Sequence, residues 1–589
     1  MFTAGLSAQA TAPQLVRSHE LVDGHERVLQ ALDLERFTLQ RLSVPARPGL
    51  VTEIGVVIEG EAVTLQLRPH DVRSSEYQLF MTDADGSLVP AESGPLQTFR
   101  GSVLEWPGSR AAGSMVNGEL DAIVSIGEGL PVYGIQAARP HLPSARADDY
   151  VVHSSLDVRA GDWTCAEPLV ETDAFTHDLP PAAPGYLGAS DVLITEIACD
   201  ADFEYYQLNG SSVANTEADI LNIINRVEEI YEPDVGLVYE VTAIVVRTSE
   251  PDPYNTTNPG GLLGQFRSHW QFNHAGIQRD IAHFFTGKNV DGSVIGIASL
   301  GVICNLASGY GLSQSRFTSN LVSRTGLTAH ELGHNWSAPH CNGQSDCGIM
   351  CSGLGGCTGV LTTFGATPRS QIIAHKQNKG CLEDLVPPPL PTISNVSPGS
   401  VAALDGGEVV VTGESFKKVQ AVTLNGVEID DVTVVTQQEL RFDAPLASVI
   451  GANALVVENI TGPSAAASLD IVPVSAPVFR GPDYVLTFGI GQNLPPAVWE
   501  FASQPGDQMY LLYGFDLQTA VIKGYSLLTS PNPPLLFALN PAGVGKIEVP
   551  AALIPGAPGL QISYFFYAQG VFLDAELIGA SEIVETEIF

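Results

Sequence analysis

Short apolar segments that alternate with turns run from the N-terminus to about residue 185. Apolar and polar positions alternate with a period of two in residues 49–70, 121–129 and 130–136. This alternation is typical of strands with one buried face. We therefore predict a β-rich unit over residues 1–185. Residues 175–190 are rich in Pro and Gly and show no pattern, which indicates a linker or a processing site.

A different pattern begins near residue 186 and continues to about residue 385. Apolar residues recur every three or four positions between residues 220 and 231, which marks one face of a helix. Asn215 or Thr216 is the expected N-cap of this helix, and Pro233 lies beyond its expected end. Strand and helix patterns then alternate, and the alternation predicts an α/β unit over residues 186–385. The expected elements are strands at 237–248 and 293–304 and helices at 262–272 and 319–336.

The last third of the chain shows only short strand patterns separated by Gly, Asn and Pro turns. The sequence VPPPLP at residues 386–391 precedes it and is expected to be a stiff linker. We predict two all-β domains after this linker, over residues 392–474 and 475–589. The expected fold class is therefore multidomain, with a β-rich N-terminal segment, an α/β domain and two C-terminal β-sandwiches.

Composition and charge exclude several kinds of partner. The chain has 65 Asp and Glu against 28 Lys and Arg, a formal net charge of −37, so nucleic acids and anionic membranes are disfavoured. Hydrophobic residues make up 44% of the chain, which fits folded domains with an acidic surface. No apolar run reaches the roughly 18 residues of a membrane span, so we expect no transmembrane segment. The sequence AQATA resembles the end of a signal peptide, so residues 1–12 are either a signal-peptide remnant or an ordinary chain end.

The eight Cys residues cluster in the chain. Four of them, at positions 341, 347, 351 and 357, lie in one short Gly-rich segment, and the others are at 165, 199, 304 and 381. An even number of clustered Cys favours disulfides and an oxidising compartment. The alternative is a structural zinc site built on spacings such as that between Cys347 and Cys351.

The strongest chemical signal is the sequence HELGHNWSAPH, which begins at His330. His330 and His334 lie one helical turn apart, so both can hold one Zn²⁺ through neutral imidazole nitrogens. Glu331 stands beside the first ligand, where it can accept a proton from the water that the metal activates. If the helix ends soon after His334, the chain can turn back so that His340 reaches the same metal. A helix with solvated histidines is the alternative, but chance gives this four-residue pattern only on the order of once in a few thousand such chains.

The sequence HELGHNWSAPH, followed by CGIM, resembles the metzincin signature, and specifically that of the reprolysin (adamalysin) branch of zinc endopeptidases. The resemblance covers about residues 190–385 and is most specific over residues 280–350. It implies a zinc endopeptidase that hydrolyses peptide bonds in proteins. It also implies that an edge strand at residues 297–303 pairs antiparallel with an extended peptide substrate.

The same resemblance assigns roles to individual residues. It implies that Glu331 is the general base and that Met350 is the Met-turn residue, which packs beneath the metal without ligating it. The implied zinc ligands are His330, His334 and His340.

Two residues depart from the family pattern. Ser337 stands where metzincins usually have Gly, at a position that favours a left-handed backbone, so we expect a steric cost of around 1 kcal/mol. Cys341 replaces the Asp that commonly follows the third His in adamalysins, which suggests that a local disulfide braces the site instead.

Residues 1–185 resemble the reprolysin propeptide more loosely, through VTLQLRPHDV, TFRGSV and GSMVNGELDAIVSIGEG in the expected order. This resemblance implies that the protein is made as a zymogen. Cys165 would then be a cysteine switch, whose thiolate fills the fourth zinc position until the prosegment is removed. Because the six Cys residues from 304 to 381 can form three disulfides, a bond between Cys165 and Cys199 is an equal alternative.

Residues 392–474 resemble an IPT/TIG domain, which is an immunoglobulin-like sandwich. The resemblance rests on residues at that family's turn and strand positions, namely Pro398, Gly406, Gly407, Gly413 and Phe416. Residues 475–589 indicate a second sandwich. Both domains are either passive spacers or contact sites for an extracellular surface or matrix.

We therefore expect a secreted or cell-surface zinc endopeptidase that acts on protein or peptide substrates and is made as a zymogen. Zn²⁺ is the expected cofactor, and a structural Ca²⁺ is a further candidate. The alternative is an adhesive or binding protein with an inactive metzincin domain. The intact base and ligands argue against that alternative, and the open fourth zinc position argues against a purely structural zinc site.

Overall fold

The computed structural model describes residues 14–15, 24–170 and 192–472, except 84, 128–129, 160, 345, 356–359, 403–406 and 445–450, and beyond residue 472 it describes the backbone of strands. The chain divides into two compact units, Met1–Pro387 and Pro388–Phe589. The division falls within the sequence VPPPLP.

A nine-stranded antiparallel sheet forms most of the N-terminal part of the first unit. The period-two pattern of the sequence explains its buried face: in β4, Val63, Leu65 and Leu67 are buried and the residues between them are not. Helix α1 (His25–Ala31) packs its apolar side against β2 and β11. In spatial order the strands are β1 (Gln14–Leu15), β2 (Thr38–Arg41), β11 (Asp149–Ser154), β10 (Val132–Ala137), β9 (Glu119–Ser125), β8 (Arg110–Val116), β7 (Thr98–Val103), β4 (Glu61–Pro69) and β3 (Thr52–Ile58).

A second sheet carries the α/β part of the unit, and three of its strands come from the segment 1–185. These are β12, β5 and β6. Strands β13, β14, β15, β17 and β5 run parallel, and β16 runs antiparallel to β17. The spatial order is β12 (Thr164–Cys165), β16 (Val294–Ala298), β17 (Tyr310–Ser313), β15 (Ile281–Phe285), β13 (Leu193–Ala201), β14 (Leu237–Val246), β5 (Arg73–Thr82) and β6 (Leu88–Pro90), with β18 (Glu383–Asp384) paired to β13.

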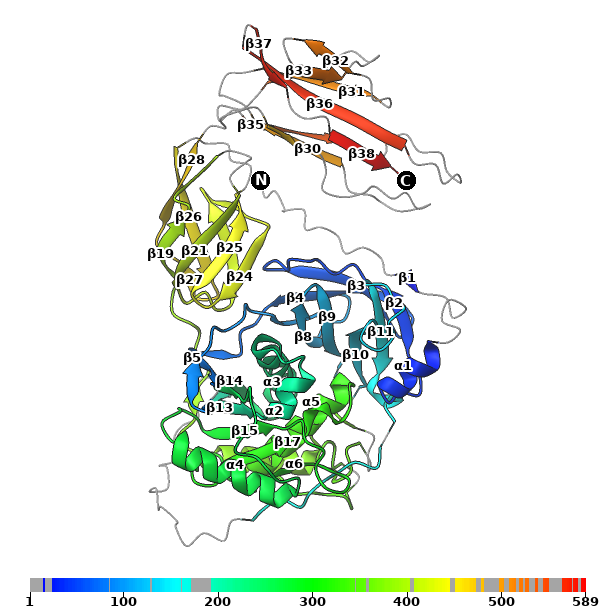
Figure 1. Cartoon of the computed structure of the whole chain (residues 1–589), viewed down its shortest axis with the longest axis vertical. Helices are drawn as coiled ribbons and strands as arrows, with labels where there is room; N and C mark the ends of the chain where they lie inside the picture. The colour runs from blue at the N-terminus through cyan, green and yellow to red at the C-terminus, as the bar shows by residue number, and fades with distance from the viewer. Residues whose placement is uncertain are drawn as a thin grey trace. The chain divides into compact units, whose positions relative to one another are not determined.

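Helices cover both faces of this sheet (Figure 1). Helices α3 (Val213–Val235), α5 (Leu321–Asn335) and α6 (Ala366–Lys376) pack on one face, and α4 (Pro259–Asn273) packs on the other. Strand β14 shows the two faces directly, because Ile244 and Val246 belong to the first core and Ala243 and Val245 to the second. The short helices are α2 (Phe203–Leu208) and the 3₁₀ turns η2 (Ser155–Asp157) and η3 (Ser315–Phe317).

The ends of helix α3 differ from the sequence prediction. The helix begins earlier than expected, with Ser212 rather than Asn215 or Thr216 as N-cap. Pro233 lies inside the helix, in its last turn, where it removes only one hydrogen bond. The helix ends at Gly236, whose φ of +66° provides the left-handed cap.

The second unit consists of strands. Residues up to 472 form one sheet with the order β19 (Thr392–Ser397), β21 (Glu408–Glu414), β25 (Glu439–Asp443), β24 (Val432–Thr436), and another with β20 (Ser400–Ala402), β28 (Ala467–Val472), β26 (Gly451–Asn459), β22 (Val419–Leu424), β23 (Val427–Glu428) and β27 (Gly462–Pro463). The remaining strands are β29 (Val478–Arg480), β30 (Ala497–Ala502), β35 (Val544–Val549), β34 (Leu535–Ala538), β31 (Gln508–Gly514), β36 (Tyr564–Asp574), β37 (Glu576–Ala580), β38 (Val584–Ile588), β32 (Thr519–Ile522) and β33 (Tyr525–Leu528). The β-rich character predicted for this region is confirmed, and the IPT/TIG assignment stays a prediction.

Among the described residues, no helix has the length and apolar character needed to cross a membrane.

Candidate metal centre

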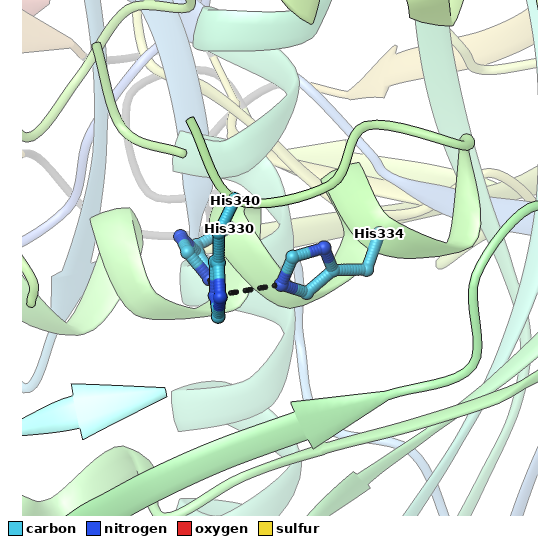
Figure 2. A group of neighbouring side chains, drawn as sticks. All are labelled: His330, His334 and His340. Atoms are coloured by element: carbon cyan, nitrogen blue, oxygen red, sulfur yellow. Dashed lines mark hydrogen bonds between the residues drawn. The ribbon is translucent and has the colours of Figure 1, made fainter. Parts of the chain in front are cut away.

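Helix α5 and the turn after it bring the three predicted His ligands together. Asn320 caps the helix, its side-chain oxygen accepting a hydrogen bond from the Ser323 amide at 3.1 Å. After the helix ends, Ser337 adopts a φ of +77° and the chain reverses, with the Ala338 amide donating to the Gly333 carbonyl. This reversal places His340 opposite the helix face that carries His330 and His334, as Figure 2 shows.

The three imidazoles turn their Nε2 atoms towards one point. Nε2 of His340 lies 3.1 Å from that of His330 and 3.2 Å from that of His334. Three nitrogens bound to one tetrahedral zinc at about 2.0–2.1 Å are separated by about 3.3 Å. The spacing therefore fits a zinc ion held by all three rings.

Backbone carbonyls fix the protonation of two of these rings. Nδ1 of His330 donates to the Ile349 carbonyl at 2.6 Å and Nδ1 of His334 to the Ala338 carbonyl at 2.7 Å. Because a carbonyl only accepts, the proton of each neutral ring sits on Nδ1 and the Nε2 lone pair is free for a metal. Burial lowers the pKa of His330 to about 3 and also lowers that of His334, so both are neutral near pH 7.

Glu331 points into the same site. It is fully buried, and neither carboxylate oxygen has a hydrogen-bond partner among the described residues. Burial raises its pKa to about 8, and interaction with the Cys165 thiol opposes this rise. Gly296 of β16 faces the carboxylate so closely that a Cβ there would lie 2.2 Å from Oε1. The sequence prediction missed Gly296, because nothing in the sequence links it to a residue 35 positions away.

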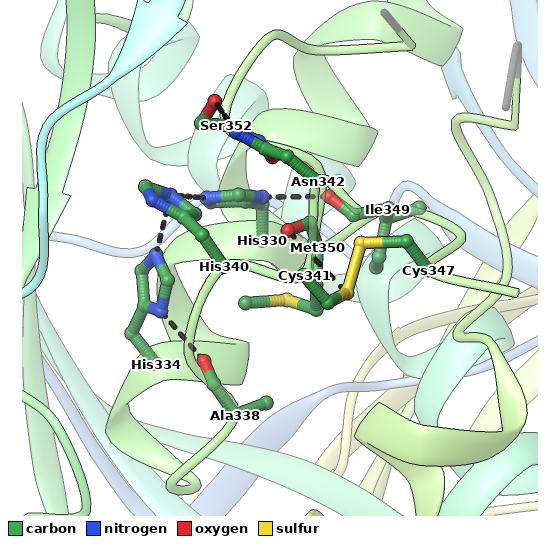
Figure 3. The surroundings of a disulfide bond; sticks show 10 residues. All are labelled: His330, His334, Ala338, His340, Cys341, Asn342, Cys347, Ile349, Met350 and Ser352. Carbon is green, nitrogen blue, oxygen red and sulfur yellow. Dashed lines mark hydrogen bonds between the residues drawn. A yellow bond between two sulfur atoms is a disulfide. The ribbon is translucent and has the colours of Figure 1, made fainter. Parts of the chain in front are cut away.

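Met350, the predicted Met-turn residue, and a disulfide at Cys341 lie next to the three His side chains (Figure 3). Met350 is fully buried, and a Cβ at Gly333 would lie 2.6 Å from its sulfur, so Gly333 allows the Met to pack against α5. Cys341 forms a disulfide with Cys347, and its amide donates to the Met350 carbonyl at 3.3 Å. The expected local disulfide at Cys341, next to His340, is thus confirmed.

The structure does not support the alternative of a zinc site built from Cys residues, because the Cys residues proposed for it form disulfides. Cys304 is bonded to Cys381, and Cys351 is disulfide-bonded as well. Cys165 and Cys199 are both free and buried, so the alternative in which these two pair with each other is wrong. Cys199 lies in the core beneath α3, whereas Cys165 lies at the metal site.

Residues 162–170, which we call the strap, lie along the outer edge of β16. Cys165 pairs with Gly296 in parallel register, and the amides of Ala166 and Leu169 donate to the carbonyls of Gly296 and Ala298. The Cys165 sulfur lies within 4.8 Å of ligand atoms of both His330 and Glu331. Strand β16 ends at Ala298, so the edge strand lies at 294–298 and not at the predicted 297–303.

Comparisons with known proteins point to one family. A family model named Reprolysin_5 and described as Metallo-peptidase family M12 matches residues 193–371. The chain is 25% identical over 174 residues to "Disintegrin and metalloproteinase domain-containing protein 19" of Mus musculus, covering 30% of this chain and 18% of that protein. The protein of the same name in Homo sapiens is 25% identical over 199 residues, covering 32% of this chain and 20% of that protein. The chain therefore spans about a fifth of the length of these curated relatives.

A solved structure, that of metalloproteinase-II from Bacteroides fragilis, has a TM-score of 0.33 and 14% sequence identity, covering 55% of this chain and 90% of that one. The family match includes all of helix α5 and the turn that follows it. Residues 193–371 therefore belong to the reprolysin-like metzincins of metallopeptidase family M12.

Proposed function

We propose that this chain is a zinc-dependent endopeptidase made as an inactive precursor. The observation that carries the proposal is the meeting of three Nε2 atoms beside a buried carboxylate that has no hydrogen-bond partner among the described residues. A Zn²⁺ held by His330, His334 and His340 would polarise the scissile carbonyl and lower the pKa of a water molecule towards 7.

Glu331 supplies the base in this proposal. Its carboxylate accepts the proton of the attacking water and returns it to the leaving amine. The pKa of about 8 belongs to the buried state beneath the strap. Departure of the strap admits water and a bound dication favours the ionised form, so both changes lower this pKa and make the base available near pH 7.

The edge of β16 supports a protein substrate. The strap already forms main-chain hydrogen bonds there, which is how an extended peptide binds by strand addition. The strap runs parallel to β16, whereas the resemblance implies an antiparallel substrate. The strap therefore fills the cleft with reversed polarity, which disfavours cleavage of its own peptide bonds.

The position of Cys165 supports the zymogen. Burial first, and then the Glu331 carboxylate, raise the thiol pKa in the absence of a metal. A dication at the three imidazoles favours the thiolate, so Cys165 can occupy the fourth ligand position until the strap leaves.

The proposed activity is tested by casein digestion with the processed protein, with and without 1,10-phenanthroline. We expect cleavage that the chelator abolishes and that Glu331→Gln loses while keeping its zinc. If the processed wild-type protein shows no chelator-sensitive cleavage, the alternative of an adhesive protein with an inactive metzincin domain is favoured.

The switch is tested on the unprocessed protein. Cys165→Ala removes the thiol, so we expect chelator-sensitive cleavage without processing. Cys199→Ala is the matched control, because it removes the other free buried thiol away from the metal site. Equal latency of both variants would contradict the switch.

Secretion and a structural Ca²⁺ are finer parts of the proposal. Disulfides support folding in an oxidising compartment. Asp280 supports the Ca²⁺ expectation, because its pKa is raised to about 7, mainly by burial and with contributions from the charges of Glu196 and Glu383, although a hydrogen bond from the Glu196 amide opposes the rise. A dication there would relieve this repulsion. We expect millimolar Ca²⁺ to raise the melting temperature and EGTA to lower it, and the same response in Asp280→Asn would contradict this site.

A further inference from the structure

The N-terminal segment completes the sheet of the peptidase domain. Strand β5 pairs in parallel with β14, from Gln78 opposite Ala243 to Met81 opposite Val246, and β6 pairs with β5 beyond it. Figure 1 shows β5 beside β14. Leu79 belongs to the same core as Val246, so this strand is part of the domain interior. Without β5, the backbone donors and acceptors along one side of β14 would have no strand partner.

A buried ionic anchor joins the same two parts of the chain. The guanidinium of Arg100 donates to Glu228 and Glu229 of helix α3, each at 3.0 Å, and to the Asn225 side chain at 2.9 Å. Arg110 donates to Glu229 at 2.7 Å. The side chains of Glu228 and Glu229 are only 5% and 6% exposed, so they depend on these arginines for charge compensation.

A third contact supports the active-site helix. The side-chain oxygen of Gln136 accepts a hydrogen bond from the Leu321 amide at 3.1 Å, in the first turn of α5. The side-chain Nδ2 of Asn320 donates a hydrogen bond to the Leu32 carbonyl at 3.0 Å. The N-terminal segment thus satisfies polar groups at the start of the helix that carries the zinc ligands.

The strap is held differently. It is a single extended segment, bound at the edge of β16 by backbone hydrogen bonds such as those of Ala166 and Leu169, and its first half also packs Trp163 and Cys165 against an apolar cluster that includes residues of α5. Towards its end the side chains face solvent, with Glu167 85% and Val170 69% exposed. No contact of β5, Arg100 or Gln136 described above passes through the strap, so the strap can leave the cleft while those contacts remain.

We propose that residues 24–159, which we call the N-terminal body, stay bound as a separate subunit when the chain is cut between residues 170 and 192. The active peptidase is then a two-chain protein, and activation removes only the strap from the cleft. The claim about activation rests on the proposed function. The claim that the N-terminal body stays bound after the cut does not depend on it. All of the contacts join residues on the two sides of the cut directly.

The test uses the full chain with residues 176–182 replaced by the recognition sequence of a site-specific viral protease. After cutting, we expect both fragments to elute together in size-exclusion chromatography at 150 mM NaCl, with the mass of the uncut chain. Separate elution of the two fragments would overturn the proposal.

Two variants sharpen the test. We expect Arg100→Ala combined with Arg110→Ala to raise the dissociation rate of the cut protein at least tenfold, and the control Arg27→Ala, at an exposed residue of the body, to leave it unchanged. In cut Cys165→Ala protein, we expect casein cleavage in the fractions that contain both fragments. Cleavage confined to fractions without the N-terminal fragment would overturn strap-only activation. Co-elution with no cleavage in any fraction would instead overturn the proposed function and leave the subunit claim standing.

Discussion

Ser337 has a backbone conformation that few residues other than glycine tolerate. Its φ of +77° lies in the left-handed region, at the turn that leads to His340. A side chain in this conformation destabilises the folded state by roughly 1–2 kcal/mol, and Gly avoids this cost. Gly also gives the unfolded chain more conformational entropy, which offsets part of the stabilisation. We therefore expect Ser337→Gly to raise the free energy of unfolding by about 0.5–1 kcal/mol.

Thermal unfolding measured by calorimetry checks this expectation. Ser337→Ala is the control, because Ala keeps the Cβ and should leave the melting temperature close to that of the wild type. A lower melting temperature for Ser337→Gly would show that the Ser side chain stabilises the turn by more than its backbone costs.

Gly296 limits the space beside the proposed base. A Cβ at this position would lie 2.2 Å from Oε1 and 2.7 Å from the carboxylate carbon of Glu331, so Gly296→Ala must displace the carboxylate. We expect kcat/KM of the processed enzyme to fall at least tenfold, because proton transfer depends on the position of the base. Gly276→Ala, where a Cβ would meet nothing within 4 Å, is the matched control. A Gly296→Ala enzyme with full activity and unchanged zinc content would contradict this role for Gly296.

The residues of the site were predictable to the extent that they are local in sequence. His330, Glu331 and His334 lie on one helix, and helical geometry alone places their side chains together. Cys165 and Gly296 reach the same carboxylate from elements far away in the sequence, and only the folded sheet brings them there. For Cys165, the sequence left a switch and a disulfide equally open. The structure excludes the disulfide, because both thiols are free and lie in different apolar clusters.

The N-cap of α5 connects helix stability with the docking of the N-terminal body. Asn320 accepts a hydrogen bond from the Ser323 amide and donates one to the Leu32 carbonyl. We expect Asn320→Ala to lower the free energy of unfolding by about 1–2 kcal/mol, through loss of the cap and of the second bond. Asn320→Ser keeps a capping oxygen, so we expect a smaller loss. Urea denaturation followed by circular dichroism measures both, and an equal loss in the two variants would show that the cap contributes little.

Asp202, the N-cap of α2, predicts a pH dependence of stability. Burial raises its pKa to about 7, although hydrogen bonds from Thr286, Gly287 and Tyr205 oppose the rise. The folded state therefore binds the proton more tightly than the unfolded state, whose pKa is about 3.9. As pH rises from about 4 to 7, the unfolded state ionises first, so this group lowers stability over that range and adds no further change above it.

Asp202→Asn mimics the protonated acid and does not titrate. We expect the melting temperature of the variant, relative to wild type, to increase from pH 5 to pH 7.5 and to level off above that. Scanning fluorimetry of the two proteins in parallel measures this difference, in which the titration of other groups cancels. A difference that is constant with pH would contradict a raised pKa for Asp202.

Elements were easier to predict than their ends. The amphipathic pattern located α3, but its N-cap and its passage through Pro233 depend on local geometry, which the pattern does not contain. The predicted strand at 293–304 is shorter because residues beyond Ala298 turn away to meet α5, where the Gly301 and Val302 amides donate to the His334 and Asn335 carbonyls.

At the scale of the whole molecule, the sequence predicted a β-rich segment followed by an α/β segment. It could not show that β5, β6 and β12 of the first segment pair with the sheet of the second, because strand partners distant in sequence leave no trace in a single chain's pattern. The same pairing gives the proposed prosegment two distinct parts, a body that is built into the sheet and a strap that lies along its other edge.

The net charge of −37 also acts at the scale of the whole molecule. Repulsion among surface carboxylates destabilises the folded state, and the Debye length falls from about 30 Å at 0.01 M salt to about 8 Å at 0.15 M. The pairs of Arg100 with Glu228 and Glu229 are buried, so salt screens them much less than it screens the surface. We therefore expect the melting temperature to rise between 10 and 500 mM NaCl, and to rise equally in KCl because screening does not depend on the cation. An unchanged or falling melting temperature would mean that attractive surface pairs outweigh the repulsion, and the acidic surface would then stabilise the protein at low salt.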